Sequence, residues 1–216
     1  SELAHQIAKF SPHALHLLDY EESNLFTLMQ AFENDNPHLN CRTWVADIRN
    51  SEKMHNIMTH IRPQVVFHAA AYKHVPLVEA NPLSGLANNV LGTQTLAREA
   101  EMAGVERFVL VSSDKAVRPT SVMGSSKRLA ELVVQDLAVR SSGTVFSIVR
   151  FGNVLGSSGS VVPIFQEQIS RGGPVTVTHQ DVRRYFMTVR EAVHLVLRAG
   201  AMATGGEVFV LDMGEE

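Results

Sequence analysis

The stretch from Val109 to Lys127, VLVSSDKAVRPTSVMGSSK, decides how we expect this sequence to fold. It begins within a short apolar run, Phe108 to Val111, which is typical of a strand buried on both faces of a parallel sheet. A polar cluster, Ser112 to Lys115, follows directly. Because open α/β sheets bind ligands at the carboxyl ends of their strands, we predict that this cluster lies in a ligand site.

The second half of the stretch predicts a helix that begins near Thr120 or Ser121. Met123 and Lys127 would then lie one turn apart on the same face of that helix. A hydroxyl, a carboxylate, two amines and a sulfur would converge on one pocket, which predicts a proton-transfer site. Ser-Ser-Asp is also common in turns and helix caps, so the stretch alone leaves that alternative open.

Strand-like and helix-like segments alternate along the chain. We expect strands at 14–18, 43–46, 65–68, 108–111 and 145–149, and helices at 2–10, 21–32, 82–102, 121–139, 162–170 and 189–203. One further helix would be capped by Ser51. This alternation predicts an α/β fold with a doubly wound parallel sheet, like that of Rossmann proteins.

The pattern changes after Arg150, where glycines become frequent. We predict a dinucleotide-binding domain over residues 1–150 and part of a substrate-binding region over 151–216. No glycine occurs before Gly85, so the glycine-rich fingerprint of dinucleotide sites is missing. The chain also begins with a helix-like segment, and we therefore expect a piece of a longer protein that lacks its first strand and glycine loop.

Composition excludes several classes of function. The 216 residues are 45% hydrophobic and carry a net charge of -3, which gives no basic surface for nucleic acid. Cys41 is the single cysteine, and no histidine spacing suits zinc, so we expect no metal. No apolar run approaches the roughly 20 residues that span a bilayer. We expect a cytoplasmic protein, and a membrane segment in a longer parent stays open.

Acidic residues follow the first two predicted strands. Asp19 lies where dinucleotide folds place an acid that binds the ribose hydroxyls, and a carboxylate there favours NAD over NADP. Asp47 and Ile48 could flank the adenine. Ordinary turn acids are an equally good interpretation of both positions.

Small and polar residues follow the next strand. A cofactor could lie against the small side chains of Ala69, Ala70 and Ala71, although tight helix packing explains them as well. Asn88 and Asn89 are poor helix formers inside a predicted helix, which favours a polar contact. Lys73 lies in a polar loop, where solvation alone would account for it.

The run FHAAAYKHVPLVEANP, from Phe67 to Pro82, resembles the extended short-chain dehydrogenase/reductases. More narrowly, it is similar to the CapD-like nucleotide-diphosphate-sugar 4,6-dehydratases. The runs VSSDKAVRPTSVMGSSKRLAE, VRFGNVLGSSGSVVPIF and RRYFMTVREAVHLV continue the resemblance in order. Members of this family have a strand and a glycine loop before the position of Ser1, and they continue beyond Glu216.

The resemblance implies roles for the residues of the opening stretch. Ser113 would bind the sugar, while Asp114 and Lys115 would be the acid and the base of a dehydration. Lys127 would hold the nicotinamide ribose. Met123 stands where most of the superfamily has a catalytic tyrosine, and a thioether cannot deprotonate a hydroxyl. The implied substrate contacts are Lys73, Asn153, Ser160, Val161 and Arg184, with Lys73 also near the cofactor.

The resemblance implies a 4,6-dehydratase that converts UDP-N-acetylglucosamine to a UDP-4-keto-6-deoxy sugar for surface polysaccharide or glycan synthesis. NAD or NADP would be the cofactor, a UDP-sugar the substrate, and a homo-oligomer the expected assembly. A 4-epimerase of the same superfamily is one alternative. A non-catalytic sensor of dinucleotide fold is another, favoured by Met123 and the missing glycine loop.

Overall fold

The structure is a computed structural model that describes residues 2–155, 161–177, 179, 181 and 186–210, with the backbone alone at 161. The strands are β1 (Leu15–Asp19), β2 (Cys41–Val45), β3 (Val65–His68), β4 (Arg107–Val111), β5 (Val145–Arg150), β6 (Asn153–Val154), β7 (Phe186–Met187) and β8 (Val208–Val210).

Nine α-helices are found in these residues: α1 (Glu2–Ala8), α2 (Glu22–Asp35), α3 (Ser51–Ile61), α4 (Val75–Ala80), α5 (Pro82–Leu86), α6 (Thr93–Met102), α7 (Val122–Arg140), α8 (Val161–Ser170) and α9 (Val189–Met202). Two other helical turns are a π-helical segment, η1 (Ala87–Gly92), and a 3₁₀ turn, η2 (Asp114–Ala116). Among the described helices, none combines the length and the apolar character that a membrane crossing requires.

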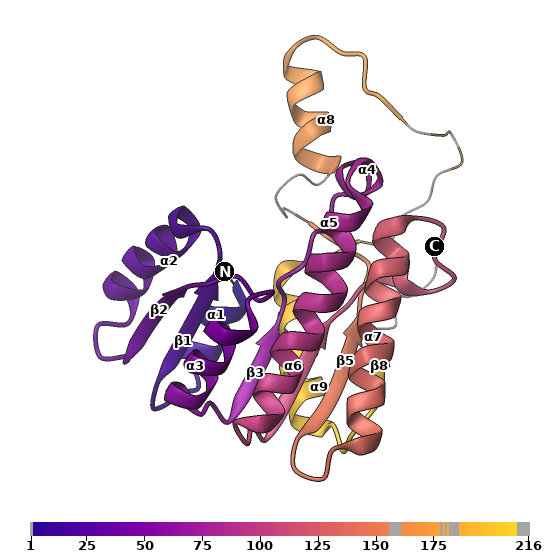
Figure 1. Ribbon diagram of the computed structural model, residues 1–216. Helices are drawn as coiled ribbons and strands as arrows, with labels where there is room; N and C mark the ends of the chain where they lie inside the picture. The colour runs from indigo at the N-terminus through magenta and orange to yellow at the C-terminus, as the bar shows by residue number, and fades with distance from the viewer. Residues whose placement is uncertain (1, 156–160, 178, 180, 182–185, 211–216) are drawn as a thin grey trace.

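The strands form parallel sheets, as the alternation of the sequence predicts. The main sheet has the order β3-β4-β5-β8, and β1 pairs with β2 in a second parallel sheet beside it (Figure 1). No backbone hydrogen bond joins these two sheets among the described residues. The expected α/β class with parallel strands is therefore confirmed, and within each of these two sheets the strands point their carboxyl ends the same way.

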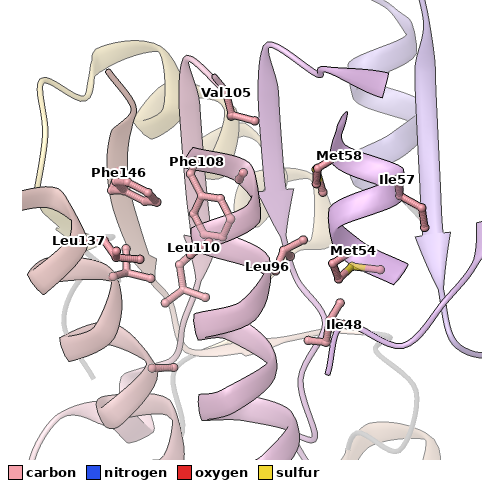
Figure 2. Close-up of a cluster of buried hydrophobic side chains, with 14 of the residues drawn as sticks. Ile48, Met54, Ile57, Met58, Leu96, Val105, Phe108, Leu110, Leu137 and Phe146 are labelled. Carbon is pink, nitrogen blue, oxygen red and sulfur yellow. The ribbon is translucent and has the colours of Figure 1, made fainter. Parts of the chain in front are cut away.

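Helices cover both faces of the main sheet because its central strands are apolar on both sides. Phe108 and Leu110 face α3, α6 and α7, where they join the largest core cluster with Phe146 (Figure 2). Val109 faces the other way and packs with Val196 of α9. Successive residues of β4 therefore point to opposite faces of the sheet, so alternate residues belong to the same core layer. Full burial of one such side chain contributes about 1.5–3 kcal/mol.

The last helix and the last strand, α9 and β8, pack against the main sheet. The helix α8 projects away from the sheets, whereas α9 packs against β4 and β5, and β8 pairs with β5 (Figure 1). Arg107 at the start of β4 donates to the carbonyl oxygens of Gly200 and Ala203, at 2.8 and 3.0 Å. The carboxyl end of α9 is therefore fixed to the amino end of β4.

Three local features differ from the predictions. Ser51 is the first residue of α3, and the preceding Asn50 is the cap that accepts from the Lys53 amide. The polar loop expected around Lys73 ends at His74, and α4 follows it directly, since proline is well tolerated in the first turn of a helix. The predicted helix over 82–102 is divided into α5, η1 and α6, and the π-helical segment is where Asn88 and Asn89 become buried.

Candidate active site

The polar cluster after β4 forms a compact turn. The hydroxyl of Ser113 accepts from the Lys115 amide at 3.2 Å and donates to the Asp114 carboxylate at 2.8 Å. The Asp114 amide donates to the carbonyl oxygen of Phe151, which follows β5, at 3.1 Å. The turn is therefore fixed both by its own side chain and by the neighbouring strand end.

Lys115 links the two strand ends directly. Its ammonium lies 3.0 Å from a carboxylate oxygen of Asp114 and donates to the side-chain oxygen of Asn153 at 3.1 Å. The side chains of Lys115 and Asp114 are 35% and 48% exposed, so a ligand can reach both. An acid, a base and an amide thus meet at the edge where open α/β sheets bind ligands.

The predicted helix lies where the sequence indicates, with Ser121 as its cap. The Ser121 hydroxyl accepts from the Gly124 amide, and Met123 and Lys127 both lie on the buried face of α7. The Lys127 ammonium donates to the Val111 carbonyl oxygen at the end of β4, at 2.6 Å. Burial lowers the pKa of the Lys127 ammonium to about 8, although the negative charge of Glu131 partly opposes this shift.

Glu131 lies one further turn along α7 and is fully buried. Its carboxylate accepts from the Ser112 hydroxyl at 2.6 Å, from two guanidinium nitrogens of Arg150 at 2.8 and 2.5 Å, and from Arg128 at 2.9 Å. Burial alone would raise the pKa of Glu131, but the hydrogen bonds from Arg150, Ser112 and Arg128 outweigh it and lower that pKa. The carboxylate is therefore ionised within the protein.

Asn89 joins the loop after β3 to the same helix. Its side-chain oxygen accepts from the Tyr72 amide at 2.8 Å, and its nitrogen donates to the Tyr72 carbonyl and to the Ser126 hydroxyl at 3.0 and 2.9 Å. Ser126 in turn donates to the Met123 carbonyl. The predicted Asn88 is buried beside it and donates to the Asn89 oxygen, so Asn89 is the residue that organises this region.

Gly124 permits the turn and the helix to approach each other. A β-carbon on Gly124 would lie 2.3 Å from the Lys115 carbonyl oxygen and 3.2 Å from the Pro119 side chain. Because the first of these atoms belongs to the backbone, it cannot move without displacing the turn. A side chain at this position is therefore incompatible with the observed placement of Lys115 over α7.

The predicted cofactor contacts lie at the ends of other strands. Asp19 ends β1 and accepts from the Glu21 amide, whereas the Asp47 carboxylate is held by the guanidinium of Arg49. Ile48 is buried in the main core. The alanines 69–71 follow β3, where the first two are exposed, and Lys73 is exposed in the loop beyond them.

These residues fit a dinucleotide in their chemistry. The half-buried carboxylate at the end of β1 suits the hydroxyls of one ribose. The small exposed side chains at the end of β3 suit a flat ring, and the Lys127 ammonium suits a second ribose. The buried His68 of β3 uses one ring nitrogen toward Thr93, at 2.8 Å, and its Nδ1 has no partner among the described residues. Burial lowers the pKa of His68 to about 3, which keeps the ring neutral.

The structure brings some predicted site residues together and leaves others apart. Ser113, Asp114, Lys115 and Asn153 form one connected group. Ser160 and Arg184 lie outside the described residues, and Val161 is described only as the first backbone position of α8.

Glu131 and Arg150 were missed as site residues, and one sequence signal pointed to Glu131, whereas Ser112 belongs to the predicted polar cluster. Glu131 is a charged residue four positions after Lys127, on the face of α7 that also carries the apolar Ala130, Val134 and Leu137. Lys and Glu are almost never fully buried unless they are paired. That observation predicts a buried partner, but it does not say which residue provides it.

Comparison with known proteins agrees with the fold, which is that of the extended short-chain dehydrogenase/reductases. The chain belongs to the family described as polysaccharide biosynthesis protein, whose model matches residues 1–216. The chain is similar to the capsular polysaccharide biosynthesis protein CapD of Staphylococcus aureus, with 49% identity, and to the probable polysaccharide biosynthesis protein EpsC of Bacillus subtilis, with 50%. Each alignment covers 100% of this chain and 36% of the relative, so the chain spans about a third of their length.

Enzymes that act on nucleotide sugars are also among the similar proteins. The UDP-glucose 4-epimerase of Rickettsia rickettsii is 36% identical over 89% of this chain and 58% of its own length.

Solved structures share the fold. Pen from Bacillus thuringiensis is 35% identical with a TM-score of 0.91, covering 98% of this chain and 66% of that one. The dTDP-glucose 4,6-dehydratase DesIV from Streptomyces venezuelae, solved with NAD bound, has a TM-score of 0.80 over 97% of this chain and 70% of its own. Its 23% identity extends the likeness to the fold alone.

We predict that Gly124→Ala displaces the Asp114–Lys115 turn and destabilises the protein by about 1–3 kcal/mol, because the new methyl group meets the Lys115 backbone. Gly143→Ala is the matched control, since a β-carbon there meets nothing within 4 Å, and it should change stability by no more than about 0.5 kcal/mol. Urea unfolding of both variants measures the difference. Equal stabilities would contradict the close approach of the turn to α7.

We also predict a pH-dependent contribution of Lys127 to stability. Its pKa of about 8 in the folded protein lies below the ordinary 10.5, so the unfolded chain binds more protons between these two pH values. The Lys127→Met variant has no charge at this position. The free energy of unfolding of the unaltered protein minus that of Lys127→Met should therefore rise by about 2 kcal/mol from about pH 7 to about pH 10. Urea unfolding of both proteins at both pH values tests this, and parallel pH profiles would contradict it.

Proposed function

We propose that this chain carries the catalytic centre of a nucleotide-sugar 4,6-dehydratase that acts on UDP-N-acetylglucosamine and forms a UDP-4-keto-6-deoxy sugar. The observation that carries the proposal is the contact of the Lys115 ammonium with both Asp114 and Asn153 at the strand ends. The family membership and the similarity to the capsular protein support surface polysaccharide synthesis as the setting.

An elimination across C5 and C6 of the sugar needs a base for the C5 proton and an acid for the C6 hydroxyl. Lys115 and Asp114 are in contact at 3.0 Å, so one proton can pass from the ammonium to the carboxylate. That transfer gives the neutral amine and the carboxylic acid that the elimination needs. Lys115 then takes the C5 proton, Asp114 donates its proton to the leaving hydroxyl as water departs, and the ion pair is restored. General acid–base groups contribute about 10²–10⁴-fold each.

A nicotinamide dinucleotide would supply the oxidation at C4 and the reduction at C6. Lys127 would bind its ribose next to the nicotinamide, and Asp19 would bind the other ribose and disfavour a 2′-phosphate, which supports NAD over NADP. The NAD held by the structurally similar dehydratase from Streptomyces venezuelae supports this class of cofactor. Met123 offers a buried thioether in place of the tyrosine, and a thioether cannot take the C4 proton. The Ser113 hydroxyl, which contacts Asp114, would orient the C4 hydroxyl.

A 4-epimerase is the second candidate, favoured by the 36% identity to the rickettsial enzyme. Epimerisation at C4 leaves C5 and C6 unchanged and needs no acid and base beside them. The adjacent Asp114 and Lys115 therefore favour dehydration, and they speak equally against a sensor without catalysis. The homo-oligomer, the cytoplasmic location and the division near residue 150 stay predictions.

We predict that the protein that carries this chain, incubated with UDP-N-acetylglucosamine and NAD in heavy water, places solvent deuterium at C5 of the sugar. Lys115→Ala should abolish the C5 deuterium signal in nuclear magnetic resonance, because no base remains for the C5 proton. Lys53→Ala, on the far helix α3, is the matched control and should exchange normally. A Lys115→Ala protein that still exchanges C5 would remove Lys115 from the role of base.

A further inference from the structure

We propose that Glu131 is the positioning residue of this site: its buried carboxylate joins the ends of β4 and β5 to α7 and thereby fixes Lys115 and Lys127 relative to each other. The inference deepens the proposed function and rests on it. Glu131 touches neither Lys115 nor Asp114, so it would act through the elements that it holds.

The geometry of the contacts supports this role. One carboxylate oxygen of Glu131 accepts from Ser112, directly after β4, and from Arg150 of β5. The other accepts from Arg150 and from Arg128 of α7. Four donor atoms, from the end of β4, from β5 and from α7, therefore meet at one fully buried side chain. Removal of a partner from such a buried network leaves charges that nothing else compensates.

The residues that hold Glu131 adjoin the residues of the site. Ser112 directly precedes Ser113, and Arg150 directly precedes Phe151, whose carbonyl oxygen accepts from the Asp114 amide. A shift of either strand end would thus change the distance between Lys115 and Asn153. Misplacement of reacting groups by about 1 Å can reduce turnover by about 10²-fold.

Glu131 is also the negative charge that opposes the lowering of the Lys127 pKa. Lys127 lies one turn before it on α7, while His68 of β3 faces Lys127 with a neutral ring, and the cationic Arg128 and Arg150 are bound to Glu131 itself. Loss of the Glu131 charge would leave the buried ammonium among a neutral histidine and two arginines. Lys127 would then lose its proton at lower pH.

The test compares Glu131→Gln with the unaltered protein in the presence of NAD and UDP-N-acetylglucosamine. We expect kcat to fall by about 10²-fold and the alkaline limb of its pH profile to move to lower pH. Nuclear magnetic resonance of labelled lysine, with Lys127→Arg to assign the signal, should report a lower Lys127 pKa in Glu131→Gln. A loss of turnover that is equal at every pH, with the Lys127 pKa unchanged, would overturn the inference.

Three variants complete the design. Glu131→Asp keeps the charge, so it should retain the Lys127 pKa better than Glu131→Gln does and recover part of the turnover. Ser112→Ala removes one donor and no charge. It should reduce kcat several-fold without moving the alkaline limb of the pH profile. This variant tests the role of the network if Glu131→Gln fails to fold. Asp136→Asn breaks an exposed pair with Arg140 on the same helix and should match the unaltered protein. An Asp136→Asn protein that loses as much turnover would contradict a specific role for Glu131.

The two proposals fail in different ways. If the unaltered protein forms no dehydrated sugar, the dehydratase proposal is wrong, and the resonance comparison still decides whether Glu131 controls Lys127. If the unaltered protein dehydrates the sugar and Glu131→Gln does so at the same rate, the dehydratase proposal stands and the positioning role is wrong.

Discussion

The buried ion pair between Glu131 and Arg150 is the interaction on which the arrangement of the candidate site depends. Burial of two charges costs several kcal/mol of solvation, and such a pair often adds no net stability over apolar packing. Its value here is geometric, because the carboxylate also binds Ser112 and so fixes two strand ends to one helix. A helix packed only through apolar side chains could slide by fractions of an ångström. Three directed hydrogen bonds, from Ser112 and Arg150 to Glu131, permit far less movement.

The parallel sheet explains why the site lies where it does. Parallel strands end at the same edge, so the turn after β4 and the loop after β5 become neighbours although they are distant in sequence. The helix α7 then crosses beneath them and presents Lys127 to the end of β4. Gly124 allows this helix to approach the Lys115 backbone, and Asn89 fixes its first turns to the loop after β3. One helix, α7, is therefore in contact with the loops and turns at the ends of three strands.

Sequence patterns predicted most of the fold because its strands and helices have unambiguous periods. The apolar run at Phe108 to Val111 indicated a strand covered on both faces. The helix expected to begin near Ser121 is α7, and its buried face carries Met123 and Lys127. Features that depend on a single side chain were not predictable in this way. The π-helical segment arises where Asn89 turns inward to bind Tyr72, and no periodicity encodes that choice. The partners of Glu131 likewise depend on strand register, which a single sequence does not specify.

The central claim is that the Asp114–Lys115 pair serves the removal of water from a sugar. The mass of the sugar nucleotide formed from UDP-N-acetylglucosamine by the protein that carries this chain, with NAD present, tests this claim most directly. The account predicts a product lighter than the substrate by one molecule of water, and its loss in Asp114→Asn. A product of unchanged mass with an inverted C4 would identify an epimerase and contradict the account.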